Sequence, residues 1–322
     1  MRDFARPRVV VSKCLEFDAC RYNGVMIPSP VVRKLMPHVD FAPVCPEVEI
    51  GLGVPRSPIR IVLERGMARL IQPETGRDVT GDMVRFVDSF LGSVADIDGF
   101  ILKFKSPSCG LKGVKIYASA AKDASSSAGS GFFGGPVLER FSHLAVEDEG
   151  RLKNFKIREH FLTCLFTLAD FRRVKAAGLM RELVRFHTDN KLLLMAYSQK
   201  ALRSLGRIVA NPDKLPVKDV LSAYEQELHR ALVRPPRGTS CINVLMHGLG
   251  YFSKQLSARE KAFFLDSLQE YRDEHVPLSV PVSIIRSYVV RFEQQYLVRQ
   301  AFFEPYPETL VSVADSGKGR DL

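Results

Sequence analysis

The sequence predicts an α/β N-terminal half with a parallel, Rossmann-like sheet, followed by an all-α C-terminal half. Three observations support this fold class. Short β-branched runs alternate with helical patterns before residue 149, the pattern from Arg151 onward is helical, and a Ser/Gly-rich stretch at 122–136 precedes the junction. For a chain of 322 residues we expect two domains, at 1–149 and 150–310, and a disordered polar tail at 311–322.

Strands and helices alternate along the first half. Helices are expected at Val31–Met36 and Gly81–Val94, where apolar residues recur at helical spacing. The stretch 122–136 is expected to be a flexible loop, either a domain linker or an active-site lid. The strands expected around these segments are Pro7–Val11, Val39–Val44, Gly99–Lys105 and His143–Val146.

The second half has helical spacing throughout. A helical segment over Met180–Val209 is stopped by Asn211 and Pro212. No apolar stretch approaches the roughly 20 residues that span a bilayer, and the N-terminus lacks a signal-peptide core. We therefore expect a cytoplasmic protein without a membrane partner. The further helices are expected at Pro216–Leu232, Cys241–Leu256, Ala258–Glu274 and Val282–Arg299.

The positive charge is concentrated in the second half. Residues 1–149 hold 19 Lys and Arg against 18 Asp and Glu, so nearly all of the net charge of +10 lies in residues 150–322. A segregated basic excess is typical of proteins that bind polyanions such as nucleic acid. The alternative is a charged surface that only keeps the protein in solution.

Four of the six cysteines lie in the first 109 residues. Cys14, Cys45 and Cys109 each follow an expected strand, and ligands of parallel sheets bind at the carboxyl ends of strands. In a reducing cytosol such thiols favour metal binding or catalysis over disulfides. Together with Cys20 they match neither a ferredoxin run nor the paired Cys-x2-Cys arms of structural zinc, so spacing alone leaves the metal open.

Polar residues beside these cysteines are candidates for acid–base work. Glu47 is two residues after Cys45, and Ser106 and Ser108 precede Cys109. A carboxylate beside an electron-rich cluster suits a general base. The alternatives are a carboxylate at a helix start for Glu47 and turn capping for the two serines.

Three motifs resemble the thiouracil desulfidase (TudS) family over residues 5–149. They are Ser12-Lys13-Cys14-Leu15 with Cys20-Arg21-Tyr22-Asn23-Gly24, Cys45-Pro46-Glu47 with Gly51-Leu52 and Pro55-Arg56, and Lys105-Ser106-Pro107-Ser108-Cys109-Gly110. The run Leu183-Val184-Arg185-Phe186-His187 with Lys191–Tyr197 resembles the domain of YbgA-type proteins. The fused pair resembles the RudS-type desulfidases, which act on 4-thiouridine in transfer RNA.

The resemblance implies a 4Fe-4S cluster held by three cysteines, with one iron left open for the sulfur of the thiocarbonyl. Cys109 and Cys14 match two ligands, and either Cys45 or Cys20 is the third. The strand ends favour Cys45, whereas the loop spacing allows Cys20. By motif position Glu47 matches the base that activates water, and Ser106, with Ser108 beside it, matches the serine that orients this water or stabilises charge.

The expected reaction is non-redox hydrolysis of 4-thiouridine to uridine and hydrosulfide, with transfer RNA as the partner. Free thiouracil and thiouridine nucleotides are further candidate substrates. The basic half would bind RNA phosphates, and the α/β half would receive a base extruded from the RNA. The expected RNA-binding residues are Arg172, Arg173, Lys175, Arg181, Arg185, His187, Lys200, Arg203, Arg207 and Arg237.

Two other functions remain open at this point. A non-catalytic iron–sulfur sensor that binds nucleic acid would use all four N-terminal cysteines as ligands. A structural zinc site in an RNA-binding protein would give colourless protein.

Overall fold

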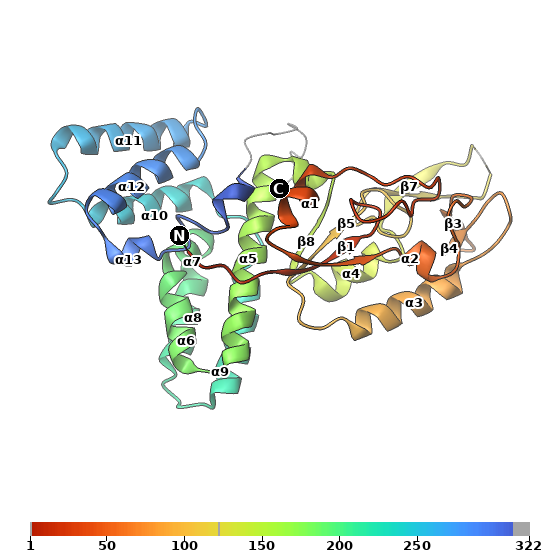
Figure 1. Ribbon diagram of the computed structural model, residues 1–322, viewed down its shortest axis with the longest axis horizontal. Coiled ribbons are helices and arrows are strands. Elements are labelled where there is room, and N and C mark those ends of the chain that lie inside the picture. The colour runs from red at the N-terminus through yellow and green to blue at the C-terminus, as the bar shows by residue number, and fades with distance from the viewer. Residues whose placement is uncertain (1, 122, 312–322) are drawn as a thin grey trace. The chain divides into compact units, whose positions relative to one another are not determined.

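The computed structural model describes residues 2–121 and 123–311 (Figure 1). These residues form two compact units. The α/β unit holds Ala5–Ala169 with residues 310–311, and the helical unit holds Asp170–Thr309 with residues 2–4. The division falls inside helix α5 (Phe155–Ala177), later than the predicted domain boundary at 150, which stays a prediction. The predicted disordered tail lies, beyond Val311, outside the described residues.

A fully parallel sheet forms the centre of the α/β unit. Its strands, in spatial order, are β2 (Asp40–Val44), β1 (Arg8–Ser12), β5 (Gly99–Leu102) and β8 (Ala145–Asp148). These strands confirm the predicted parallel α/β fold. The apolar runs of β1 and β5 are buried on both faces, as covered parallel strands require.

Helices connect and cover this sheet. The predicted helices are confirmed as α1 (Pro30–Leu35) and α3 (Thr80–Ser93). The sequence did not indicate the short α2 (Pro46–Glu49) or α4 (Gly134–Phe141). Apolar residues of α3 and α4 pack in one core with residues of the sheet, among them Met83, Phe100 and Val137.

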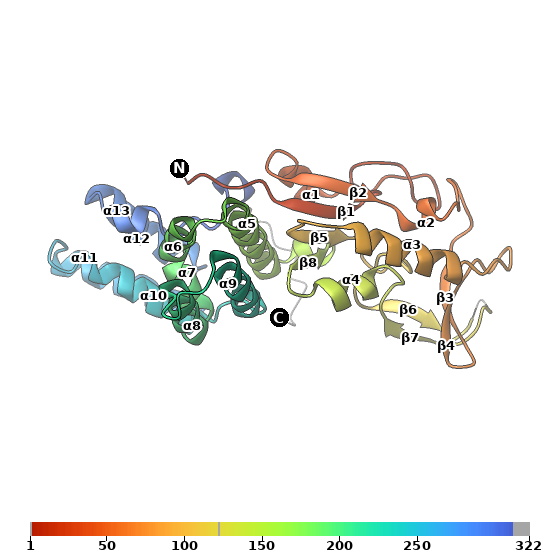
Figure 2. The same cartoon turned by 90° about the horizontal axis from the view of Figure 1, so that it is seen from below.

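A second, mixed sheet was not predicted. Its order is β4 (Met67–Ile71), β3 (Arg60–Glu64), β6 (Val114–Tyr117) and β7 (Ser126–Gly129). The β3–β6 pair is parallel and the other two pairs are antiparallel. Figure 2 shows β6 and β7 set apart from β1 and β5 within this unit.

The expectation of a flexible loop over 122–136 is therefore wrong for part of that stretch. Ser126–Gly129 pairs with β6 as an edge strand, and Gly134 begins α4. Backbone hydrogen bonds hold this exposed edge strand, whose one apolar side chain is the small Ala128, so hydrophobic periodicity could not reveal it.

The helical unit confirms the predicted all-α half. Its longer helices are α9 (Val217–Leu232), α10 (Gly238–Gly250), α11 (Ala258–Arg272) and α12 (Ser279–Arg291). The Met180–Val209 segment divides into α6 (Met180–Asp189), α7 (Lys191–Tyr197) and α8 (Gln199–Ala210), and a short α13 (Gln295–Val298) follows α12. Capping side chains explain these breaks, because Ser198 accepts a hydrogen bond from the Ala201 amide and Gln294 accepts one from the Tyr296 amide. Within residues 2–121 and 123–311, none of the helices combines the length and apolar character needed to cross a membrane.

Candidate functional site

Three cysteine-bearing segments meet at one edge of the parallel sheet. Strands β1, β2 and β5 run in the same direction, so the segments that begin at Lys13, Cys45 and Lys103 leave from their carboxyl ends. The chain passes from β2 on one side of β1 to β5 on the other, which makes this edge a topological switch point. Ligands of open α/β sheets bind in the crevice at such a point.

The four N-terminal thiols are buried and free. Cys14, Cys20, Cys45 and Cys109 are each at most 9% exposed, and none of them is in a disulfide. The Cys45 thiol lies 3.9 Å from the backbone oxygen of Cys20. The structure therefore brings Cys20 close to the segment that carries Cys45.

The thiols influence one another's ionisation. Burial, and after it the charge of a Cys45 thiolate, raises the pKa of the Cys14 thiol to about 12. Burial and the charges of Cys45 and Cys14 likewise raise the pKa of Cys20 to about 12. Burial raises the pKa of Cys109 well above its ordinary value; a hydrogen bond with Ser12 opposes this rise, and the Cys45 and Cys14 charges add to it.

These four buried thiols are better suited to bind iron and sulfide than to contact water. Crowded, buried thiols are protonated when alone, whereas a cationic metal centre stabilises them as thiolates. The charge of Cys45 raises the pKa of the Cys14, Cys20 and Cys109 thiols, and the charge of Cys14 raises the pKa of the Cys20 and Cys109 thiols. Among the described residues, no three His, Cys, Asp or Glu side chains are arranged to hold a single metal ion.

Glu47 is fixed by a buried arginine. Pro46 and Cys45 start helix α2, which presents Glu47 in its first turn. Oε2 of Glu47 accepts hydrogen bonds from Nε and Nη2 of Arg56 at 2.9 and 2.7 Å. Arg56 also donates from Nη1 to the backbone oxygens of Cys20 at 3.0 Å and Gly53 at 2.8 Å, so one guanidinium ties the carboxylate to two loops of the site.

A chain of hydroxyl groups leads to the same carboxylate. The Ser108 hydroxyl donates to Oε1 of Glu47 at 2.6 Å, and Ser106 Oγ lies 2.9 Å from Ser108 Oγ. Because the single proton of Ser108 is given to Glu47, Ser106 is the donor in the second bond. Ser106 Oγ also accepts from the backbone amides of Ser108 and Cys109 at 3.2 and 3.1 Å. The hydroxyl protons therefore point from Ser106 through Ser108 to Glu47.

The structure thus assigns the two serines different positions. Motif matching singled out Ser106, yet Ser108 is the serine that contacts Glu47, and it is only 1% exposed. Ser106 is half-buried and stands at the start of this series of hydroxyl groups. Ser106 also caps the turn, as the capping interpretation predicts, and its functional role stays a prediction.

The glycines of the 131–134 segment support the Ser106–Gly110 loop. Amides of Phe133 and Gly134 donate to the Ser108 backbone oxygen at 2.8 and 3.0 Å. A Cβ on Gly134 would lie 2.4 Å from the Gly110 backbone oxygen, and one on Gly131 would lie 2.4 Å from that of Ser108. Only glycine permits this close approach, so this part of the predicted lid is a fixed brace.

The sequence patterns gave no role to three residues of the site, Ser12, Lys103 and Glu149. The Ser12 hydroxyl accepts from the Lys103 amide at 2.9 Å and is hydrogen-bonded to the Cys109 thiol. Lys103 forms a buried ion pair with Glu149 and lowers the pKa of Cys14 against the effect of burial. Lys103 interrupts the apolar run of the strand before Cys109, and this lone charge is the signal that could have revealed it.

The predicted RNA-binding residues fall into two groups. Several of them already have partners. The ion pairs are Arg173 with Asp170 and Asp3, Lys175 with Glu225, Arg181 with Glu182, and Arg185 with Asp189. His187 is hydrogen-bonded to the Tyr224 hydroxyl, and Arg172 also has a partner.

The others are exposed and form no ion pair within the described part of the chain. They are Lys200, Arg203 and Arg207 on one face of α8, and Arg237 at the start of α10. Of the predicted set, these four are the cations that the described part of the structure leaves available for an external polyanion.

Two family models match the chain in succession. The model of 2-thiouracil desulfurase matches residues 9–149, and that of a protein of unknown function, DUF1722, matches residues 191–307. Over 148 residues the chain is 30% identical to the uncharacterized protein YbgA of Escherichia coli K12, which covers 45% of this chain and 88% of YbgA. The chain belongs to the 2-thiouracil desulfurase family, extended by a YbgA-type domain.

Two further proteins are similar to part of this chain. The uncharacterized protein YbbK of Bacillus subtilis 168 is 34% identical over 110 residues, which are 32% of this chain and 72% of YbbK. A solved structure described as the [4Fe-4S]-dependent thiouracil desulfidase TudS is 31% identical and covers 46% of this chain and 93% of its own, with a TM-score of 0.37. The family assignment depends on the sequence matches.

Proposed function

We propose that this desulfurase is an RNA 4-thiouridine desulfidase, which hydrolyses 4-thiouridine in transfer RNA to uridine and hydrosulfide. The observation that carries the proposal is the chain from Ser106 through Ser108 to Glu47, set beside the buried thiols at the switch point. Membership of the 2-thiouracil desulfurase family supports the reaction class. Free thiouracil and thiouridine nucleotides are smaller candidate substrates for the same site.

Cys14, Cys45 and Cys109 are the proposed ligands of a 4Fe-4S cluster, and Cys20 is the alternative third ligand. Each thiol would bind a different iron, so these residues need not have the spacing of a single-ion site. When bound, a cluster with one iron lacking a protein ligand supplies a Lewis acid for the thiocarbonyl sulfur. A redox-inert zinc ion would supply no colour, which makes the visible spectrum a direct test of the metal.

Glu47 is the proposed general base. The Arg56 guanidinium balances its charge, and one carboxylate oxygen is held by Arg56 while the other accepts from Ser108. A water beside the half-buried Ser106 could pass its proton along the hydroxyl chain to Glu47 as its oxygen attacks C4 of the pyrimidine. As the C–S bond breaks, the second proton of the attacking water leaves with sulfur as hydrosulfide, and the proton on Glu47 returns through the same hydroxyl groups to solvent.

The proposal is tested by incubating anaerobically purified, brown protein with transfer RNA that contains 4-thiouridine. Nucleoside mass spectrometry should show 4-thiouridine replaced by uridine, with hydrosulfide released in equal amount. Unchanged 4-thiouridine in the presence of an intact cluster would contradict the enzyme proposal and favour a sensor.

Arg56 is expected to act as a positioning residue. Arg56→Lys should lower turnover by about tenfold or more, since a lysine cannot bond Glu47, Cys20 and Gly53 together. The same change should lower the melting temperature, because each hydrogen bond lost to a buried acceptor costs roughly 1–3 kcal/mol. Arg85→Lys, in an exposed pair with Asp82, is the matched control and should change neither quantity.

The basic face of α8 is the proposed phosphate-binding surface. Changing Lys200, Arg203 and Arg207 together to Gln should weaken transfer RNA binding and lower the slope of log K against log salt by about two to three. Turnover of free 4-thiouridine should stay unchanged. Arg181→Gln with Arg230→Gln removes paired charges and should have the smaller effect; equal effects would contradict the assignment of this face.

A further inference from the structure

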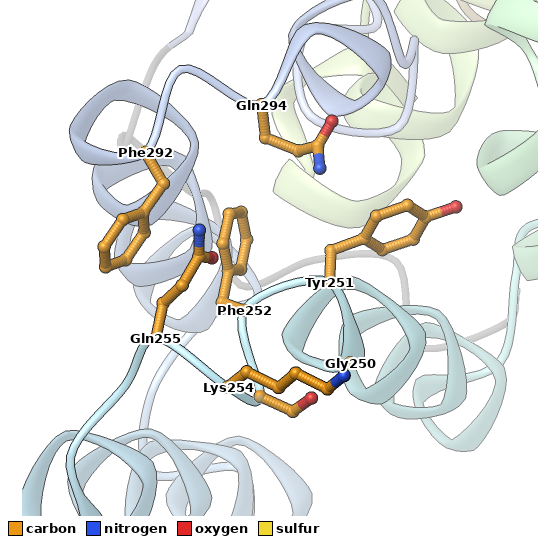
Figure 3. Close-up of a pocket in the computed structure, with 8 residues that line it drawn as sticks. Gly250, Tyr251, Phe252, Lys254, Gln255, Phe292 and Gln294 are labelled. Carbon is orange, nitrogen blue, oxygen red and sulfur yellow. The ribbon is translucent and has the colours of Figure 1, made fainter.

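A separate pocket lies in the helical unit after the end of α10. Its volume is about 350 Å³, and it is lined by residues 250–255, Phe292 and Gln294 (Figure 3). None of the predicted RNA-binding residues lines it. Ligand pockets in proteins start at roughly 300 Å³, so the space is sufficient for one nucleobase with part of its backbone.

An aromatic platform stands at this pocket. The Tyr251 ring is 47% exposed and stacks on Tyr296, with ring centroids 5.5 Å apart and planes 21° apart. Phe252 is buried against Phe292 behind it, with centroids 5.6 Å apart. One face of a pre-ordered ring is therefore available, and stacking on such a ring is how proteins hold unpaired bases.

Polar groups with free hydrogen-bonding capacity surround this platform. The side-chain oxygen of Gln294 accepts from the Tyr296 amide at 3.3 Å, which leaves its NH₂ group to donate, and in Figure 3 this side chain points toward the space between Phe252 and Tyr251. Gln255 and Lys254 are exposed, and within the described residues Lys254 forms no ion pair and the Gln255 side chain no hydrogen bond. Amides bind base edges, and a lysine binds phosphate.

The charges beside the pocket favour a nucleotide over a simple anion as its ligand. Lys254 is the cation of the lining, and the exposed carboxylate of Glu293 adjoins Gln294 in the chain. Because the charges of Lys254 and Glu293 are opposite, a bare phosphate would gain little binding energy here. A nucleotide can gain from stacking, which does not depend on net charge.

We propose that this pocket binds one unstacked nucleotide of a single-stranded RNA segment. The base stacks on Tyr251, the amide of Gln294 contacts its edge, and Lys254 contacts the adjoining phosphate. The proposal rests on RNA as the partner in the proposed function, but it requires neither a cluster nor desulfuration.

The test is the affinity of the full chain for a labelled, unmodified oligoadenylate, measured by fluorescence anisotropy. Tyr251→Ala should raise Kd about tenfold, in line with the loss of one stacked base, while Tyr251→Phe should bind like the unchanged protein. Lys254→Gln should lower the salt slope by about one, and the control Lys34→Gln, on α1, should not.

Cross-linking of the unchanged protein gives an answer that does not depend on how the variants fold. Irradiation with a short RNA that contains 5-bromouridine should label the peptide that carries Tyr251. No label there, equal affinities of Tyr251→Ala and the unchanged protein, or no binding of the oligonucleotide at all would overturn the proposal. Binding without desulfuration would instead contradict only the proposed function.

Discussion

Glu47→Gln is expected to lower the desulfuration rate by about 100-fold or more, the usual lower range for loss of a general base. Gln keeps the shape of the side chain and can still accept from Ser108. It carries no negative charge, so it can neither take the proton that arrives through Ser106 and Ser108 nor balance Arg56.

The measurement is the single-turnover rate with thiolated RNA, alongside the iron content and visible spectrum of the variant. Both of the latter should match the unchanged protein, because Glu47 is not a proposed cluster ligand. Glu139→Gln, an exposed carboxylate on α4, is the control and should retain full activity. A cluster-loaded Glu47→Gln protein with undiminished rate would rule out the base role.

Cys45→Ser is expected to abolish both the cluster and the activity, whereas Cys20→Ser should keep most of each. Cys45 follows β2 at the carboxyl edge of the sheet, and its charge acts on both Cys14 and Cys109. Cys20 lies on the longer loop after Cys14, away from the end of a strand.

Iron analysis and the visible spectrum after anaerobic purification distinguish the two variants, and Cys241→Ser, a buried thiol in the helical unit, serves as the control. If Cys20→Ser loses the cluster and Cys45→Ser retains it, Cys20 is the third ligand. If both lose it, the cluster is bound by four cysteines, which would favour the sensor over the enzyme.

The contacts between distant segments that form the proposed proton pathway from Ser106 to Glu47 could not be predicted from the sequence. Glu47 and Ser108 were each chosen from their neighbours in the motifs, but their hydrogen bond joins residues that are 61 positions apart. The same holds for Arg56, which motif matching noted without a role, and for Lys103 with Glu149. Electrostatic pairs of this kind depend on how loops pack, which no local pattern records.

Local patterns predicted, in their order along the chain, the four strands of the parallel sheet, and they placed Cys14, Cys45 and Cys109 after the first three of them, since apolar periodicity reports local burial directly. Three features could be seen only in the folded chain: the contact of Ser108 with Glu47, the support that the glycines near 131 give to the cysteine loop, and the α8 cations, which form no ion pair among the described residues. A side chain's partners are set by packing across the sheet edge and between helices, whereas propensity and spacing describe only neighbours along the chain.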